Sequence, residues 1–595
     1  MVDRAIVVGS GAGAAVACMV LAHNGWEVEV LEKGPRYIHG WHKEGPIKTE
    51  FSNDELKFLR NFDQPDPISE PRVFRSKVGG ARTVGVVNPL ASVVGGGTTH
   101  WDAKVPRFWD IDFKKKSMLG PYPDSDVEDW PFSYEEIAPH YRTIERLMGA
   151  QGSQAKLPKA PTLKHAPGKR GYIMPPGPMQ LASTTVARGC ESLGLHPYPF
   201  PMAANSRHHL GRPACNNCGQ CSDYGCPIGA RIGALAVMQH AVKTGKVHIR
   251  DSVMVDKVVH NGKRASGVHY IDKHGKHHTM HADLVVIACS AIESSRLAHL
   301  SHFPDPHDRI GRDMMFHNFI DGFGIFLDKR MHAYRGRSVT MCCEDFADPD
   351  FPGARAFAKS MGLPYFRGGI MELGGSEDVI AEGMEYSFVL DALASAPGGA
   401  IKPFGSAFKR LMEASLLRDR LAGIDHIAED LPYATNRVDL DPKVRDFRGV
   451  PVPRLTYSQG KHEQATALFY VPLMTELLKA SGAGAVGAAL PETVSNSVTG
   501  ANIPHGAHIM GGMRMGHNRK TSVTDGTGMV HGMDNVFVAD GSVFPSSGAQ
   551  NPTLTIMATA LRNATKLFGH GHKHVGLEAP QQRAGTTSAS TTEED

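Results

Sequence analysis

The stretch Arg4-Ala-Ile-Val-Val-Gly-Ser-Gly-Ala-Gly-Ala14 decides the fold that this sequence predicts. Ala5–Val8 is a short apolar run rich in β-branched residues, which predicts a buried strand. Small and apolar residues then follow at helical spacing from Ala15 to Ala22, and a second strand is predicted at Trp26–Leu31. The beginning of the chain therefore predicts a strand, a glycine turn, a helix and a strand.

The glycine turn predicts a dinucleotide-binding site. It reads Gly9-x-Gly11-x-x-Ala14, with Gly13 between, so that the turn is tight, the backbone can approach a pyrophosphate, and a small residue stands where the helix packs on the strand. The N-terminus of the helix offers N–H groups to the phosphates. Glu32 ends the second strand, where it can accept a hydrogen bond from a ribose hydroxyl. A turn that only packs is the alternative, and the full context favours the dinucleotide.

Composition limits the classes of function. A chain of 595 residues is long enough for two or more domains. Its 64 basic and 61 acidic residues nearly balance, so neither nucleic acid nor an anionic membrane surface is an expected partner. No apolar run reaches the roughly 18 residues of a membrane span. Because the first strand begins near Met1, we expect no cleavable signal peptide, and export only as a folded chain bound to a signal-bearing partner.

A second glycine cluster, Gly95-Gly-Gly-Thr-Thr-His-Trp101, predicts another close approach of the backbone to a flat or phosphorylated group. Gly96, Gly97 and Thr98 lead directly into His100 and Trp101. His100 could bond covalently to a flavin or lie beside its ring. From spacing alone, a hydrogen-bonded histidine beside a tight loop is the favoured interpretation.

Four of the nine cysteines lie close together, within residues 212–230, at spacings C-x2-C-x2-C-x4-C followed by proline: Cys215, Cys218, Cys221 and Cys226. Zinc sites usually place two C-x2-C pairs on separated loops. A single tight cysteine loop ending in Cys-Pro is more typical of an iron–sulfur cluster. The cluster is therefore favoured, with structural zinc and purely structural cysteines as alternatives.

The middle of the chain predicts a second domain. A β-meander is expected at 246–272, and a buried strand at 284–288 leads into a helix that would close the parallel sheet. Short strands, for example at 386–390 and 452–457, then alternate with helices at 405–422 and 461–481. We expect an α/β fold with a cofactor domain at 1–350, a substrate domain at 351–500, a return to the cofactor domain at 501–575 and a disordered tail at 576–595.

Near the end of the chain, His508 precedes a pair of glycines, and a strand at Val536–Ala539 ends in Asp540-Gly541. A further glycine turn brings Asn551 to the predicted N-cap of a helix that Pro552 and Thr553 begin. The free N–H groups of that helix would stabilise negative charge on a ring that accepts electrons.

Taken together, these motifs resemble the glucose–methanol–choline (GMC) family of FAD oxidoreductases over nearly the whole chain. The fold that this resemblance implies is a Rossmann-type FAD-binding domain plus an α+β substrate-binding domain, similar to that of p-hydroxybenzoate hydroxylase. The cysteine loop resembles the flavoprotein subunits of gluconate, fructose and glucoside 3-dehydrogenase complexes. The Thr99-His100-Trp101 element resembles pyranose oxidase, in which the matching histidine bonds covalently to FAD.

The resemblance also implies roles for individual residues. His508 matches the family's catalytic base and Asn551 its second active-site residue, while Asp540 and Gly541 lie against the cofactor. Val253 joins the residues expected to bind FAD. The four cysteines would hold an iron–sulfur cluster, [3Fe–4S] rather than [4Fe–4S]. One departure is Ala288-Cys289-Ser290, where many relatives have Ala-Ala-Gly.

The expected function is an FAD-dependent dehydrogenase that oxidises a secondary or anomeric hydroxyl of a sugar, glycoside or sugar acid. Electrons would leave through the cluster to a haem or cytochrome c subunit or a soluble carrier. A small signal-bearing subunit would place the complex at the periplasmic face of the inner membrane, with the cytoplasm as the alternative. Gluconate would need a cationic anchor, for which Arg355, Arg437 and Arg454 are available, and a neutral glycoside is favoured.

Two other activities compete with the dehydrogenase. One is a pyranose-oxidase-like enzyme that produces hydrogen peroxide, with FAD bonded to His100 and a purely structural cysteine loop. The other is a lyase that contains FAD but does not use it for redox chemistry. A binding module without chemistry fits poorly with a complete FAD site and a histidine–asparagine pair.

Overall fold

The computed structural model describes residues 2–36, 38–39, 48–49, 68–85, 87, 90–157, 159–219, 221, 225–332, 335–337, 339–374, 405–414, 418–489, 504 and 507–569. The strand predicted at 386–390 and the tail predicted at 576–595 lie outside these residues. No helix among the described ranges is both long and apolar enough to cross a membrane.

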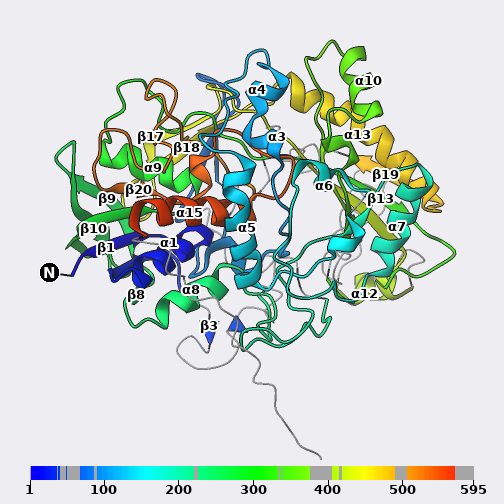
Figure 1. Cartoon of the computed structure of the whole chain (residues 1–595), viewed down its shortest axis with the longest axis horizontal. Helices are drawn as coiled ribbons and strands as arrows, with labels where there is room; N and C mark the ends of the chain where they lie inside the picture. The colour runs from blue at the N-terminus through cyan, green and yellow to red at the C-terminus, as the bar shows by residue number, and fades with distance from the viewer. Residues whose placement is uncertain are drawn as a thin grey trace, which may run out of the picture.

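A five-stranded parallel sheet forms the first half of the molecule, in the order β20-β12-β1-β2-β8. Its strands are β1 (Arg4–Val8), β2 (Glu27–Leu31), β8 (Val247–Arg250), β12 (Leu284–Ile287) and β20 (Val536–Val538). Helix α1 (Ala12–His23) contacts both α8 (Ala234–Val242) and α15 (Thr553–Phe568), the last described helix (Figure 1). The predicted Rossmann-type unit is confirmed, and β20 adds residues from near the end of the chain to its sheet.

The glycines of the first turn allow the contacts that hold this half together. Helix α1 is buried along its length from Gly13 to Ala22, as expected of a helix covered on all sides. A Cβ atom on Gly13 would stand 1.5 Å from the carbonyl oxygen of Ala539, and one on Gly9 would stand 2.5 Å from that of Ala288. Only glycine lets the helix approach the ends of β20 and β12 this closely.

A six-stranded sheet forms the second half, in the order β19-β13-β16-β15-β14-β7. Its strands are β7 (Tyr198–Pro199), β13 (Asn318–Ile325), β14 (Val339–Cys343), β15 (Gly369–Gly374), β16 (Leu421–Ala428) and β19 (Ala485–Ala489). Helices α7 (Leu181–Ser192) and α13 (Lys461–Ala480) pack on each other and cover one face, around a core that includes Tyr470 and Met474. The other face is turned toward the cavity described below.

The structure also contains smaller sheets and further helices. They are β3 (Ile38–His39) with β4 (Lys48–Thr49); β5 (Arg72–Arg75) and β6 (Thr83–Gly85) with β17 (Arg437–Arg445) and β18 (Pro451–Thr456); the meander β9 (Met254–His260), β10 (Ala265–Ile271) and β11 (His277–His281); and helices α3 (Asp110–Phe113), α4 (Lys115–Leu119), α5 (Tyr134–Met148), α6 (Pro161–His165), α9 (Ala291–Ser301), α10 (Pro352–Ser360) and α12 (Gly405–Ala414).

Three details differ from the sequence-based expectation. Strand β8, predicted to open the meander, instead joins the parallel sheet beside β2. The helix predicted at 405–422 ends earlier, because β16 begins at Leu421. Strands β7, β13 and β14 of the second sheet all precede residue 350, so this sheet crosses the expected domain boundary.

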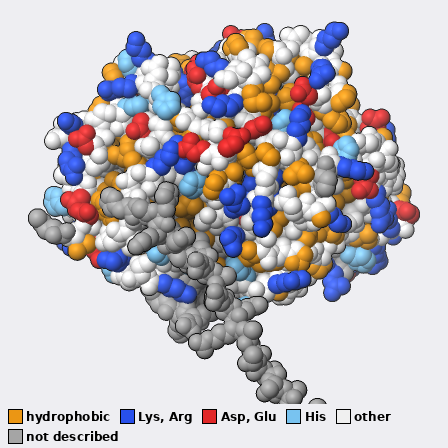
Figure 2. Space-filling view, in the orientation of Figure 1, with side chains coloured by type: hydrophobic (Ala, Val, Ile, Leu, Met, Phe, Trp, Pro, Cys, Tyr) orange, Lys and Arg blue, Asp and Glu red, His pale blue; other side chains and the backbone are white. Residues whose placement is uncertain are grey.

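On the face shown in Figure 2, neither basic nor acidic side chains predominate among the described residues. Lys and Arg side chains are interspersed with Asp and Glu over the part of that face formed by described residues. This agrees with the near balance of 64 basic and 61 acidic residues in the chain.

Candidate active site

A cavity of about 900 Å³ runs from the first glycine turn to the open face of the second sheet. The predicted site residues that line it are Gly9, Gly11, Gly13, Glu32, Gly96, Gly97, Thr98, His100, Trp101, Val253, His508, Asp540, Gly541, Asn551, Pro552 and Thr553. Ala14 does not line the cavity; it is fully buried in the core around the parallel sheet. Residues from three separate parts of the chain thus meet at one place.

The turn at Gly11 fits the predicted pyrophosphate. A Cβ atom on Gly11 would meet nothing within 4 Å, so this position faces open space within the cavity. On the other side, a Cβ atom on Gly96 would lie 3.0 Å from the Cα of Gly11, because the second glycine loop sits directly on the first turn. The backbone N–H of Gly95 donates to Ser10 Oγ at 3.0 Å and links the two loops.

Glu32 is held in place at the end of β2. Its Oε2 accepts hydrogen bonds from Ser10 N at 3.0 Å and Ser10 Oγ at 2.7 Å, and its Oε1 accepts from Gly34 N at 2.8 Å. Burial raises the pKa of this carboxyl, against the effect of those hydrogen bonds. The side chain lines the cavity, where it can still accept a bond from a ribose hydroxyl. These residues fit a bound FAD.

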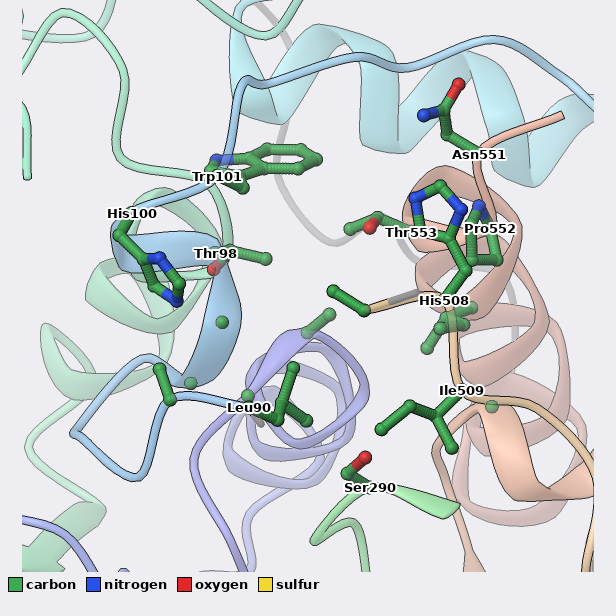
Figure 3. A pocket seen from close by; sticks show the side chains of 18 of the residues that line it. Leu90, Thr98, His100, Trp101, Ser290, His508, Ile509, Asn551, Pro552 and Thr553 are labelled. Carbon is green, nitrogen blue, oxygen red and sulfur yellow. The ribbon is translucent and has the colours of Figure 1, made fainter. Parts of the chain in front are cut away.

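Two walls face each other across the cavity (Figure 3). Thr98, His100 and Trp101 form one wall, and His508, Asn551, Pro552 and Thr553 form the other. The first wall is tied to α8, because Ala234 N donates to Thr98 Oγ1 at 2.9 Å. A flat ring bound between the walls would place His508 and Asn551 on the side of the second sheet.

Ser290 adopts an unusual backbone conformation at the start of α9. Its φ of 73° and ψ of 152° lie in a region that is essentially restricted to glycine. The residue lines the cavity next to Cys289. A serine at this position therefore introduces strain at the edge of the cofactor space.

A chain of hydrogen bonds extends from His508 into the protein. His508 Nδ1 lies 3.0 Å from His317 Nδ1, and His317 Nε2 lies 2.9 Å from the carbonyl oxygen of Gly548. A carbonyl oxygen can only accept, so His317 Nε2 carries a proton and the neutral ring has its lone pair at Nδ1. His508 Nδ1 must then be the donor of the first bond. This arrangement leaves His508 Nε2 unprotonated.

The two histidines are neutral near pH 7. Burial lowers the pKa of His317 to about 4. Burial, together with His317 and the ammonium of Lys104, also holds the pKa of His508 well below its usual value, although Asp102 opposes this. A neutral imidazole with a free Nε2 can accept a proton, which is what a general base requires.

Asn551 is oriented by the carboxyl group of Glu372 behind it. Its Nδ2 donates to Glu372 Oε1 at 3.0 Å, and Glu372 Oε2 accepts from the Lys104 ammonium. Lys104 also lies 2.8 Å from an oxygen of Asp102. Burial lowers the pKa of Lys104, but both carboxylates more than offset this and hold it well above its usual value. One amide N–H and the Oδ1 of Asn551 remain for a ligand.

The predicted helix cap at Asn551 is wrong. Helix α15 begins at Thr553, its N-cap residue is Pro552, and no side chain caps it. The amide of Asn551 bonds to Glu372 on β15 because the preceding turn carries it across to the second sheet. Asn551 therefore belongs to the cavity wall and not to the helix end.

Sequence reasoning missed several residues of the cavity. Lys104, Asp321, Glu372 and Asp425 line it, and His317 lies behind His508. Strand pairing brings Asp321 and Glu372 to Asp425. Lys104 meets Glu372 across 268 residues and His317 meets His508 across 191, so no local motif reveals any of them. The only available signal was the alternation of Phe319, Asp321 and Phe323 along β13.

The cysteine loop lies beside the first wall. All nine cysteines are free thiols; Cys218 is exposed, Cys215 half-buried, and Cys221 and Cys226 buried. Arg231 follows the loop and donates to the carbonyl oxygen of Trp101. Within the described residues, which omit 220 and 222–224 of this loop, no group of three or more Cys, His, Asp or Glu side chains converges to hold a metal ion. The thiols have the right chemistry for a cluster without forming a closed cage.

The three arginines considered as anchors for a sugar acid lie outside the cavity. Arg355 is exposed and pairs with Asp350 at 2.9 Å. Arg437 and Arg454 both pair with Asp439. None of the three is among the residues that line the cavity.

Comparison with known proteins gives a consistent result. Residues 125–319 and 432–560 match the N-terminal and C-terminal regions of GMC oxidoreductase. Similar proteins include 2-methyl-1,2-propanediol dehydrogenase of Mycolicibacterium austroafricanum (27% identical, covering 94% of this chain and 93% of the relative) and 6'''-hydroxyparomomycin C oxidase of Streptomyces lividus (27%, 95% and 91%). The fructose dehydrogenase large subunit of Gluconobacter japonicus is 26% identical, with 95% and 97% covered.

The fold also matches a solved structure. Formate oxidase of Aspergillus oryzae, in a structure whose title refers to FAD modification, superposes with a TM-score of 0.59. The match covers 96% of this chain and 99% of that one at 12% sequence identity, which supports the fold alone.

Proposed function

Because the chain belongs to the GMC oxidoreductase family, whose members use FAD to oxidise CH–OH groups, we propose that it oxidises a secondary or anomeric hydroxyl of a sugar, glycoside or sugar acid. The observation that carries the proposal is the hydrogen-bond chain that leaves His508 Nε2 unprotonated at the cavity. A base in this state is ready to accept the proton of an alcohol.

Each residue of the site has a separate role in the proposed oxidation. His508 Nε2 takes the hydroxyl proton, and His317 keeps the ring in the required tautomer. Asn551 orients the alcohol oxygen with its free amide N–H, a role that is often worth about 3 kcal/mol for one well-placed donor. Bound FAD supplies the acceptor for the hydride. Trp101 closes the opposite wall, where it excludes water from the reacting groups.

The electron acceptor is a further proposal. We propose an iron–sulfur cluster held by Cys215, Cys218, Cys221 and Cys226, which passes electrons to a haem or cytochrome c subunit or to a soluble carrier. Three observations support it: thiolates are the usual ligands of such clusters, Arg231 beside the loop donates a hydrogen bond to Trp101 of the cavity wall, and the chain is similar to a protein named as the large subunit of fructose dehydrogenase. A signal-bearing partner and the periplasmic face of the inner membrane are proposed with it, the cytoplasm being the alternative. Since the thiols do not converge in the described residues, we derive no electron-transfer step through a cluster.

An oxidase that passes electrons directly to oxygen is the second candidate. It is supported by the position of His100 on the cavity wall, where a covalent bond to FAD could form. An FAD-containing lyase without redox turnover is the third.

One set of measurements separates the three. The holoprotein, purified without oxygen, is assayed for iron and acid-labile sulfide and then mixed with a panel of sugars and polyols. Bleaching of the flavin with stoichiometric iron supports the dehydrogenase, and loss of that iron in Cys218→Ser assigns it to the loop. Bleaching without iron, followed by rapid reoxidation in air, supports the oxidase. Turnover of a substrate that never bleaches the flavin would overturn the proposed oxidation.

A further inference from the structure

A row of carboxyl groups crosses the face of the second sheet that the substrate would meet. Asp321 on β13 pairs directly with Asp425 on β16, and Asp425 pairs directly with Glu372 on β15. All three side chains line the cavity. Like charges placed directly opposite on neighbouring strands destabilise a sheet, so the fold alone gives no reason for this row.

The cations of the cavity neutralise this row only in part. Lys33, Arg72 and Arg296 cluster around Glu293, away from the second sheet. Lys104 is the one Lys or Arg among the described lining residues at this end, and it is engaged by Asp102 and Glu372. Four carboxyl groups therefore stand against a single ammonium.

Asp425 keeps an unsatisfied atom. It hydrogen-bonds to Asp321, and burial, together with that neighbouring carboxyl, holds the pKa of Asp425 well above its usual value. Its Oδ1 is buried and has no hydrogen-bond partner within the described part of the chain. Unlike Glu429 in the same half, which pairs with Lys115 and Arg367 through its Oε1, Asp425 has no ion pair within 4.0 Å of a described Lys or Arg.

A second unsatisfied atom lines the same cavity. Asn551 is only 6% exposed, and its Oδ1 likewise lacks a partner among the described residues. Since Asn551 bonds to Glu372, and Glu372 is the cross-strand neighbour of Asp425, both unsatisfied oxygens belong to one continuous surface. Buried polar atoms without partners in a cavity are typical of a site that a ligand completes.

We infer that the substrate carries an ammonium group, which Asp425 and Asp321 bind while the hydroxyl to be oxidised lies at His508 and Asn551. The ligand class is a polyhydroxylated amine, such as an amino sugar. Neighbouring strands lie about 4.8 Å apart, so the ammonium binds about 5–10 Å from the reacting carbon, within the same or the adjacent sugar ring. Phe319 and Phe323 flank Asp321 on β13 and line the same cavity.

A metal ion is a poorer occupant. Among the residues that the structure describes, no three carboxylates, histidines or cysteines are placed to hold one, and the Lys104 ammonium stands within the row. A sugar acid would meet the same negative charge and be repelled. The inference rests on the proposed function, because it names the substrate class of that same site.

The test compares matched ligands that differ by one group. The holoenzyme is titrated without oxygen with glucosamine and glucose and with galactosamine and galactose. Perturbation of the flavin spectrum measures binding, and bleaching measures oxidation. We expect each amine to bind at least tenfold more tightly than its hydroxyl partner at pH 7. Asp425→Asn should remove that preference and leave the binding of the neutral sugars within threefold.

Two controls make the result decisive. Asp350→Asn removes the same charge from the exposed surface and should leave the preference unchanged. Asp425→Asn should keep or raise the melting temperature, because it relieves like-charge contacts, whereas a purely structural aspartate would lower it. Three results would overturn the inference. They are equal affinity for the amine and the neutral sugar of each pair, an equal loss of affinity for both in Asp425→Asn, and calcium binding that this variant abolishes. Failure of every ligand to bleach the flavin contradicts the proposed function instead, while the binding preference still decides the ammonium site.

Discussion

Replacement of His317 tests most directly whether this residue keeps His508 Nε2 unprotonated and able to accept the substrate proton. In His317→Leu, His508 Nδ1 loses its acceptor, and the ring is free to place its proton on Nε2, the atom that must take the substrate proton. Partners that orient a functional histidine are typically worth 10- to 100-fold in activity. We therefore expect kcat to fall by about 10- to 100-fold, or about 1.4–2.7 kcal/mol in the barrier.

The matched variant is His317→Asn. His317 has a φ of 60°, a left-handed conformation that Asn tolerates better than most residues. Its side-chain oxygen can still accept from His508 Nδ1, so Asn should restore most of the rate. His302→Leu serves as the control for backbone strain, because His302 has a φ of 56°, is exposed, and lies outside the cavity.

The assay is the rate of flavin bleaching in single turnover without oxygen, measured across pH on FAD-loaded protein. If His317 controls the tautomer of His508, bleaching should be fastest in the wild type, slower in His317→Asn and slowest in His317→Leu. His302→Leu should bleach at the wild-type rate. If His317→Leu bleached as fast as wild type, or if Asn and Leu slowed the reaction equally at equal FAD content, the reasoning about the hydrogen-bond chain would be refuted.

Three further predictions follow from single positions. Gly11→Ala should fold normally yet retain little FAD, because its Cβ enters only the open cavity. Gly13→Ala should fail to fold, because its Cβ meets the carbonyl oxygen of Ala539. Melting temperature measures folding in both variants, and bound flavin measures FAD retention. Ser290→Gly should raise the free energy of unfolding by about 1 kcal/mol through relief of strain, measured by denaturant titration. Because the pKa of His508 is held below its usual value, kcat/KM should stay flat as pH falls from 8 to 6.5 and drop only at lower pH; an acid limb above pH 6.5 contradicts this.

The sequence predicts well what depends on local spacing. The strand, turn and helix at 4–23 follow from apolar periodicity and from glycines whose Cβ atoms would collide with the ends of other strands. His508 and Asn551 could be placed only because the family resemblance adds roles to short motifs. Periodicity did not reveal that β8 pairs with the parallel sheet, since an edge strand alternates in the same way in either kind of sheet.

The rest of the site depends on pairing between distant segments. Glu372 and Asp425 become neighbours only when β15 pairs with β16, and His317 reaches His508 only when the chain returns at 508. No motif of a few residues encodes such contacts. Asn551 shows the same limit, because its position before Pro552 suggested a helix cap while the tertiary structure turns its amide to Glu372.

The central claim is that His508 removes the hydroxyl proton during hydride transfer to FAD. The most direct measurement is the rate of flavin bleaching by an oxidisable sugar or amino sugar, without oxygen, in wild type and His508→Asn protein that hold equal amounts of FAD. The account predicts stoichiometric bleaching in the wild type. In the variant it predicts a rate at least a hundredfold lower at pH 7, without the decline that the wild type shows below pH 6.5. Bleaching of the variant at the wild-type rate would contradict it.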